Sequence, residues 1–114
     1  MVDNLEHDHI PSFAAVRAAK EKELGRKLSS EEERVLYNES TAIEVPKDVH
    51  KDSPTYKGRN TPSQIEKDAN DLCAAACRDI NELKTNLLKR GYDKGEIEAA
   101  VEKIVRRNRE IGIK

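Results

Sequence analysis

The sequence predicts a mainly α-helical domain that contains a small β-hairpin. Aromatic residues make up only 4% of the 114 residues, with no tryptophan and one phenylalanine, which argues against a β-sandwich or barrel. Apolar residues recur at helical spacing through the second half of the chain, whereas one short stretch has the alternation of a strand. The length corresponds to a single domain over residues 1–114.

The N-terminal part is expected to form a short strand followed by a helix. Residues 3–10 alternate weakly between polar and apolar side chains. Pro11 and Ser12 end this segment and begin a helix over residues 13–24. Gly25 is well placed as the C-terminal cap of that helix, because glycine adopts the left-handed backbone conformation at little cost.

A second helix and the best strand candidate follow. Ser30 and Glu33 form a capping-box pattern, so we expect a helix that begins there and runs to about Tyr37. Asn38 is expected to break it. Residues 41–45 are β-branched and alternating, which is typical of a strand.

A short helical turn and a loop are expected after this strand. Pro46 suits a first helical position, so the turn is expected to run from Pro46 to His50. Residues 51–60 are polar and include Pro54 and Gly58, and we therefore expect a loop there.

The C-terminal half is expected to form two longer helices. Thr61 and Gln64 form a second capping box, and the helix that follows is expected to run without interruption to Gly91. Asp93 and Glu96 then cap a last helix. The apolar residues of the first of these helices recur at spacings of three and four: Ile65, Ala69, Leu72, Ala76, Ile80, Leu83 and Leu87.

Composition restricts the possible classes of function. The chain has 21 basic and 22 acidic residues, so binding to nucleic acid has to rest on a local site and not on overall charge. We find no long apolar run and no signal-peptide pattern, and we expect a soluble chain. Cys73 and Cys77 are interpreted as small buried helix residues and not as a disulfide or zinc pair.

The three histidines fall in two places, each with an acidic neighbour. His7 and His9 flank Asp8, and His50 lies two residues after Asp48. Hydrolysis of a phosphodiester needs a divalent ion that neutralises charge and a base with a near-neutral pKa, and carboxylates with histidines supply both. A helical side chain leans toward the helix N-terminus, so His50 is expected to point back toward the strand that precedes it. A first strand that pairs with this strand would bring Asp8 and His9 near His50, and the sequence alone does not show that pairing.

The motifs around these residues resemble those of a known nuclease family. The run Asp8-His9-Ile10-Pro11-Ser12 resembles the first half of the HNH, or endonuclease VII-like (His-Me finger), motif. Asn38 and residues 41–50 resemble the second half. The whole chain is similar to C-terminal nuclease toxin domains of bacterial type VI secretion and polymorphic toxin systems, including their loop, here Tyr56-Lys57-Gly58-Arg59-Asn60-Thr61. The resemblance implies a ββα-metal element surrounded by helices.

The resemblance also implies roles for individual residues. Asp8 and His50 would be metal ligands, His9 the general base, and Asn38 the middle polar residue that orients the base or stiffens the loop. The chain departs from the simplest HNH pattern in two ways. Two helices are expected between His9 and Asn38, and Asn38 lies slightly further from His50 in the sequence than in compact members of the family. The expected cofactor is one divalent ion, Mg²⁺ or else Mn²⁺, Ni²⁺ or Zn²⁺.

The function expected from this resemblance is that of a metal-dependent endonuclease toxin that cleaves DNA, with RNA left open as substrate. A cognate immunity protein is the expected partner. The chain would be a secreted effector domain that acts in the cytoplasm of a target bacterium. The alternative is a non-catalytic helical binding or adaptor module, which would be indifferent to metal and to replacement of His9.

Several polar residues outside the motif core have two interpretations. Lys57, Arg59 and Asn60 precede a helix N-terminus and are expected to hold a phosphate, although a solvated loop has the same composition. His7 is expected to be a solvated side chain, or else to help position the metal. Three arginines at the end of the last helix suit the helix dipole and are alternatively DNA contacts: Arg106, Arg107 and Arg109.

Overall fold

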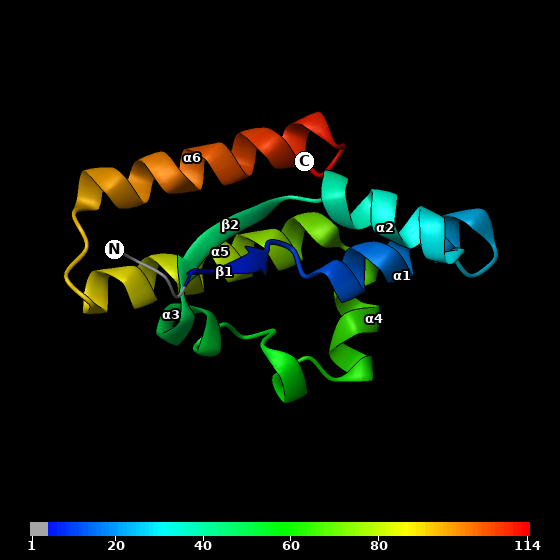
Figure 1. Cartoon of the computed structure of the whole chain (residues 1–114), viewed down its shortest axis with the longest axis horizontal. Helices are drawn as coiled ribbons and strands as arrows, with labels where there is room; N and C mark the ends of the chain where they lie inside the picture. The colour runs from blue at the N-terminus through cyan, green and yellow to red at the C-terminus, as the bar shows by residue number, and fades with distance from the viewer. Residues whose placement is uncertain (1–4) are drawn as a thin grey trace.

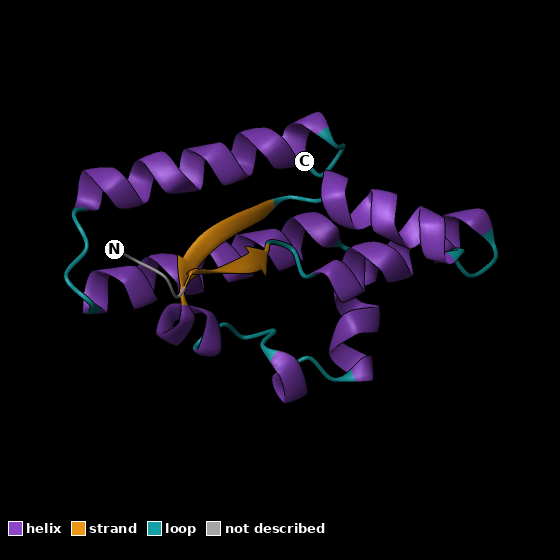
Figure 2. Cartoon of the chain, in the orientation of Figure 1, coloured by secondary structure: helices purple, strands orange, loops and turns teal. Residues whose placement is uncertain are grey.

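The computed structural model describes residues 5–114 and shows helices around two short strands (Figure 1). The strands form one antiparallel sheet, so the predicted mainly α class with a small two-stranded element is confirmed (Figure 2). Residues 3 and 4 of the expected first strand lie outside the described residues. In chain order the elements are β1 (Leu5–His9), α1 (Phe13–Leu24), α2 (Ser30–Glu39), β2 (Ala42–Pro46), α3 (Lys47–Lys51), the 3₁₀-helix η1 (Lys57–Arg59), α4 (Pro62–Asn70), α5 (Leu72–Lys89) and α6 (Lys94–Glu110).

The strands β1 and β2 pair although α1 and α2 separate them in the sequence. Leu5 lies opposite Pro46 and His9 lies opposite Ala42. The pairing continues one step beyond β1, where the backbone N–H of Ile10 donates to the carbonyl oxygen of Thr41 at 3.1 Å. The helix α3 begins directly after β2 and contacts both strands. The residues of α3 therefore lie next to β1, although they are distant from it in the sequence.

The start and end of α2 differ from the prediction. Its capping box uses Ser29 and Glu32: the N–H of Glu32 donates to Ser29 Oγ at 3.2 Å, and the N–H of Ser29 donates to the Glu32 carboxylate at 2.9 Å. The predicted box at Ser30 and Glu33 is wrong, because Glu33 instead binds Arg17 across α1 at 2.6 Å. The predicted break at Asn38 is also wrong, since α2 continues to Glu39.

The long helix predicted after Thr61 is two helices, so that prediction is wrong. Asp71 interrupts it with φ −152° and ψ 80°, and its side chain accepts a hydrogen bond from the N–H of Ala74 at 3.0 Å. An aspartate that caps the next helix breaks the backbone without breaking the apolar spacing, which is why periodicity alone missed it. The last helix begins at its predicted cap, where Asp93 accepts from the N–H groups of Gly95 and Glu96.

The hydrophobic core lies between the sheet, α3, α5 and α6. Cys73 and Cys77 are exposed, so the prediction that they are buried is wrong. Cys77 lies off the buried face of α5, and Cys73 lies in its first turn, before that face begins. The core is made of Ile10, Val45, Val49, Ala76, Leu83, Leu87, Ile97 and Ile104.

None of the helices within residues 5–114 combines the length and the apolar character that crossing a membrane requires.

Candidate functional site

The buried carboxylate of Asp8 is the centre of the candidate site. Asp8 lies near the end of β1 and is 5% exposed. Side chains two apart in a strand share a face, so Asp8 and Glu6 point to one side of β1 while His7 and His9 point to the other. Burial raises the pKa of Asp8 to about 6; the nearby His50 acts against this, and Asp79 adds to it. Among the hydrogen bonds of residues 5–114, none reaches the Asp8 carboxylate.

His50 comes back from α3 to the Asp8 face of β1. Its Nδ1 lies 2.7 Å from Oε1 of Glu6, and the two side chains are 23% and 34% exposed. The ring of Tyr56 packs edge-on against His50 with centroids 4.9 Å apart. The hydrogen bond with His50 lowers the pKa of Glu6. The structure therefore places two predicted site residues, Asp8 and His50, on one face of the sheet, together with Glu6.

A clamp from α5 holds α3 in this position. Arg90 Nε lies 2.8 Å from an oxygen of Asp48, and Arg90 Nη2 lies 2.6 Å from an oxygen of Asp52. The acidic neighbour of His50 in the sequence, Asp48, is thus bound by an arginine.

His9 lies on the opposite face of β1, in a group of aromatic rings. Its ring centroid is 4.5 Å from that of Tyr37 and 5.9 Å from that of Phe13. Burial lowers the pKa of His9, while a hydrogen bond with the Tyr37 backbone acts the other way. His9 is therefore neutral at pH 7. The structure does not bring it to the face that holds Asp8 and His50.

His7 and Asn38 are exposed. His7 Nε2 lies 3.8 Å from an oxygen of Glu44, and both of these side chains are about three-fifths exposed, at 62% and 61%. Asn38 lies in the last turn of α2, next to Tyr37, which carries the contact with His9. Neither residue touches the Asp8 face in the part of the chain that the structure describes.

Lys57 and Arg59 lie in the short 3₁₀-helix η1, and Asn60 is its C-cap, so this part of the expected loop is regular. Arg59 Nη1 donates to the carbonyl oxygen of Ser53 at 3.0 Å, and Asn60 Nδ2 donates to Ser12 Oγ at 3.3 Å. Lys57 is exposed and has φ 45°, a left-handed conformation that is uncommon for a residue other than glycine. Of the three predicted nucleic-acid contacts, Lys57 is exposed and places its Nζ 5.2 Å from the centroid of the Tyr56 ring, whereas Arg59 and Asn60 hold the segment together.

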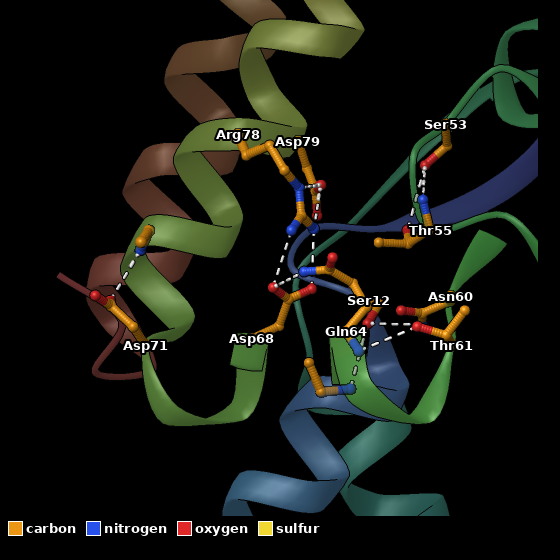
Figure 3. A network of polar contacts seen from close by, with 12 residues as sticks. Ser12, Ser53, Thr55, Asn60, Thr61, Gln64, Asp68, Asp71, Arg78 and Asp79 are labelled. Carbon is orange, nitrogen blue, oxygen red and sulfur yellow. Dashed lines mark hydrogen bonds and ion pairs between the residues drawn. The ribbon is translucent and has the colours of Figure 1, made fainter. Parts of the chain in front are cut away.

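Sequence reasoning missed a network of charged side chains around Arg78 (Figure 3), whose Asp79 is close enough to Asp8 to raise its pKa. Arg78 binds both oxygens of Asp68 at 2.9 Å and also reaches Asp79 Oδ1 at 2.8 Å, while Gln64 Nε2 donates to Asp68 at 2.8 Å. Asp79 Oδ2 is buried, with no hydrogen-bond partner among the described residues. Burial raises the pKa of Asp79 to about 6.

The balance of buried charge around Asp8 is negative. Asp8, Asp68 and Asp79 are each at least 95% buried, at 5%, 5% and 3% exposure, and Arg78 is the cation that binds two of them. Removing charge from water is costly unless it is compensated, so a region of this kind favours a bound cation. Among residues 5–114, no three His, Cys, Asp or Glu side chains form a ready-made metal cluster.

The donor set nevertheless suits a divalent ion with open coordination positions. Asp8 offers a carboxylate without a hydrogen bond from the described residues, and His50 keeps one ring nitrogen free of Glu6. Two protein ligands leave coordination positions open for water and for substrate phosphate; the carboxylate suits Mg²⁺ or Mn²⁺, and the imidazole suits Ni²⁺ or Zn²⁺. They do not suit a closed structural zinc site, which takes four ligands from the protein.

Comparison with known proteins adds one strong similarity. The chain resembles a deoxyribonuclease. It is 60% identical over 111 residues to deoxyribonuclease CdiA of Dickeya dadantii (strain 3937). The match covers 97% of this chain but 3% of deoxyribonuclease CdiA, so the chain corresponds to a small part of that protein. No family model matches the chain, and no solved structure matches it significantly.

Proposed function

We propose that this chain is the nuclease domain of a bacterial toxin and that it hydrolyses DNA in a metal-dependent reaction. The observation that carries the proposal is the 60% identity, along almost the whole chain, to a protein named a deoxyribonuclease. The site geometry supports it, because a buried and uncompensated carboxylate shares a face of β1 with a histidine. RNA is the second substrate to test, since it carries the same phosphodiester.

Asp8 and His50 are the proposed metal ligands. A divalent ion held there would neutralise the charge that develops on the phosphate and on the leaving oxygen. The buried carboxylate of Asp8 supplies negative charge in a region where Arg78 binds Asp68 and Asp79. His50 supplies a ring nitrogen, and Glu6 and Tyr56 restrict its ring on two sides.

His9 is the proposed general base. A base must be unprotonated at the working pH, and burial lowers the pKa of His9. His9 is the last residue of β1 and adjoins Asp8 in the chain. Consecutive side chains of a strand point to opposite faces, so this role requires a phosphate that lies across the end of the strand and is reached from both sides. We therefore place the scissile phosphate across the end of β1.

Substrate contacts are proposed for Lys57 and Arg59 of η1 and for its cap Asn60. An orienting role next to the base is proposed for Asn38. Lys57 is exposed, and α4 begins just after Asn60, so that backbone N–H groups and cations lie close together. The resemblance to polymorphic toxin domains extends the proposal further. It implies delivery into the cytoplasm of a target bacterium, with type VI secretion as the route, and neutralisation by a cognate immunity protein.

The test is cleavage of supercoiled plasmid with Mg²⁺, Mn²⁺, Ni²⁺ or Zn²⁺, with EDTA as the blank. His9→Ala is compared with His7→Ala, which removes an exposed histidine from the same face of the same strand. We expect His7→Ala to keep metal-dependent nicking and His9→Ala to lose about 100-fold or more, the usual contribution of a general base. Equal activity of the two variants would remove His9 from the mechanism. A folded wild-type protein that cleaves neither plasmid nor RNA with any of these ions would overturn the proposal.

A further inference from the structure

We propose that Glu6 is a positioning residue that fixes the orientation and the tautomer of His50, so that Nε2 is the nitrogen presented to the metal ion. This inference rests on the proposed function and names a residue of that site that the resemblance does not assign. The juxtaposition that carries it is the distance of 2.7 Å between His50 Nδ1 and Glu6 Oε1.

The hydrogen bond defines which nitrogen carries the proton. A glutamate is ionised at neutral pH, and an ionised carboxylate can only accept hydrogen bonds. His50 Nδ1 must therefore carry the hydrogen that Glu6 accepts. In a neutral imidazole the other nitrogen, Nε2, then has the lone pair, which is the form that binds a metal ion.

The surroundings restrict the ring further. Glu6 lies in β1 and His50 in α3, so one hydrogen bond joins the strand that carries Asp8 to the helix that carries the second ligand. Tyr56 packs edge-on against the same ring at 4.9 Å. The pair is partly shielded from water, at 34% and 23% exposure, so the hydrogen bond competes less with solvent than a fully exposed one.

The chain contains a matched pair for comparison. His7 of β1 and Glu44 of β2 form a second histidine–glutamate pair. Their atoms are 3.8 Å apart, and both side chains are mostly exposed. That distance is beyond a hydrogen bond, so Glu44 is not expected to fix a tautomer. Glu44→Ala removes the same charge from the same sheet without touching His50.

The experiment measures the tautomer and the metal affinity separately. Nitrogen-15 NMR of the metal-free protein reports which nitrogen of His50 is protonated, and electron paramagnetic resonance with Mn²⁺ alone reports affinity. For Glu6→Ala we expect a mixture of tautomers and Mn²⁺ affinity weaker by about 10- to 100-fold, the usual effect of losing a partner behind a ligand. Glu6→Gln keeps an oxygen that accepts the Nδ1 hydrogen and is expected to preserve the wild-type tautomer. Glu44→Ala is expected to match wild type in both measurements.

The outcomes separate this inference from the proposed function. A wild-type protein that binds Mn²⁺ and cleaves DNA, together with an unchanged tautomer and affinity in Glu6→Ala, would overturn the role of Glu6 and leave the nuclease standing. A wild-type spectrum with the proton of His50 on Nε2 would overturn it directly, without any metal. A failure of the wild type to bind Mn²⁺ or to cleave would instead count against the proposed function.

Discussion

Replacing Asp8 with asparagine should stabilise the metal-free protein and abolish its response to metal. Asp8 is 5% exposed, and burial raises its pKa to about 6 from an ordinary 3.8. A difference of about 2 pH units corresponds to about 3 kcal/mol against the ionised form at pH 7. Asn at this position removes that penalty, but burying its amide costs about 1–2 kcal/mol. A net gain of about 1–2 kcal/mol predicts a rise in Tm of about 4–8 °C for a domain of this size.

The sign of the pH dependence follows from the same pKa. A carboxyl whose folded pKa is raised favours the protonated state, so the wild type loses this part of its stability as the pH rises from about 4 to about 6. Above about pH 6 the loss is complete and constant. The advantage of Asp8→Asn should therefore be absent near pH 4 and fully developed at pH 7.

Thermal unfolding with EDTA and with Mn²⁺ is the assay for Asp8→Asn. At a Mn²⁺ concentration 100 times its Kd, a ligand-binding protein gains about 2.7 kcal/mol, and the wild type should show this gain. The variant should show none. Asp71→Asn is the control, since asparagine caps α5 equally well and the residue is exposed. A variant less stable than the wild type in EDTA at pH 7, or one with a full response to Mn²⁺, would refute the reasoning.

Three further predictions test the network, the nucleic-acid contact and the helix cap. Arg78→Ala leaves Asp68 and Asp79 without their cation and should lower the free energy of unfolding by about 3–5 kcal/mol in a urea titration; a loss below 1 kcal/mol would contradict a buried ionic network. Lys57→Ala should weaken DNA binding, measured by fluorescence anisotropy, and should reduce the slope of log affinity against log salt by about 1, because one phosphate contact is removed. An unchanged slope would argue against that contact. Ser29→Ala should cost about 1 kcal/mol in urea unfolding and Ser30→Ala almost nothing, and the reverse order would restore the cap predicted from sequence.

The placement of His50 is the part of the site that the sequence predicted best. A strand, a proline and a short helical turn determine the direction of the following side chain by backbone geometry alone, and His50 does lie back against β1. Local rules of this kind hold because neighbouring residues enforce them. The pairing of β1 with β2 joins segments that α1 and α2 separate, and the sequence alone did not show it.

The residues that the sequence did not reveal depend on contacts between distant elements. Glu6 was unremarkable in the sequence, and only the return of α3 gives it a partner 44 positions away. Asp79 lies within an apolar stripe of α5, where pattern reasoning registers apolar positions and passes over the polar residue between them. The side of β1 that His9 faces follows from strand alternation, but its enclosure by Tyr37 required the position of α2.

Anomalous diffraction from crystals grown with Mn²⁺ tests the central claim most directly. The account predicts a manganese peak within coordination distance of the Asp8 carboxylate and of His50 Nε2, with the remaining positions filled by water or phosphate. A well-occupied peak elsewhere in the molecule, with Asp8 and His50 free of metal, would contradict it.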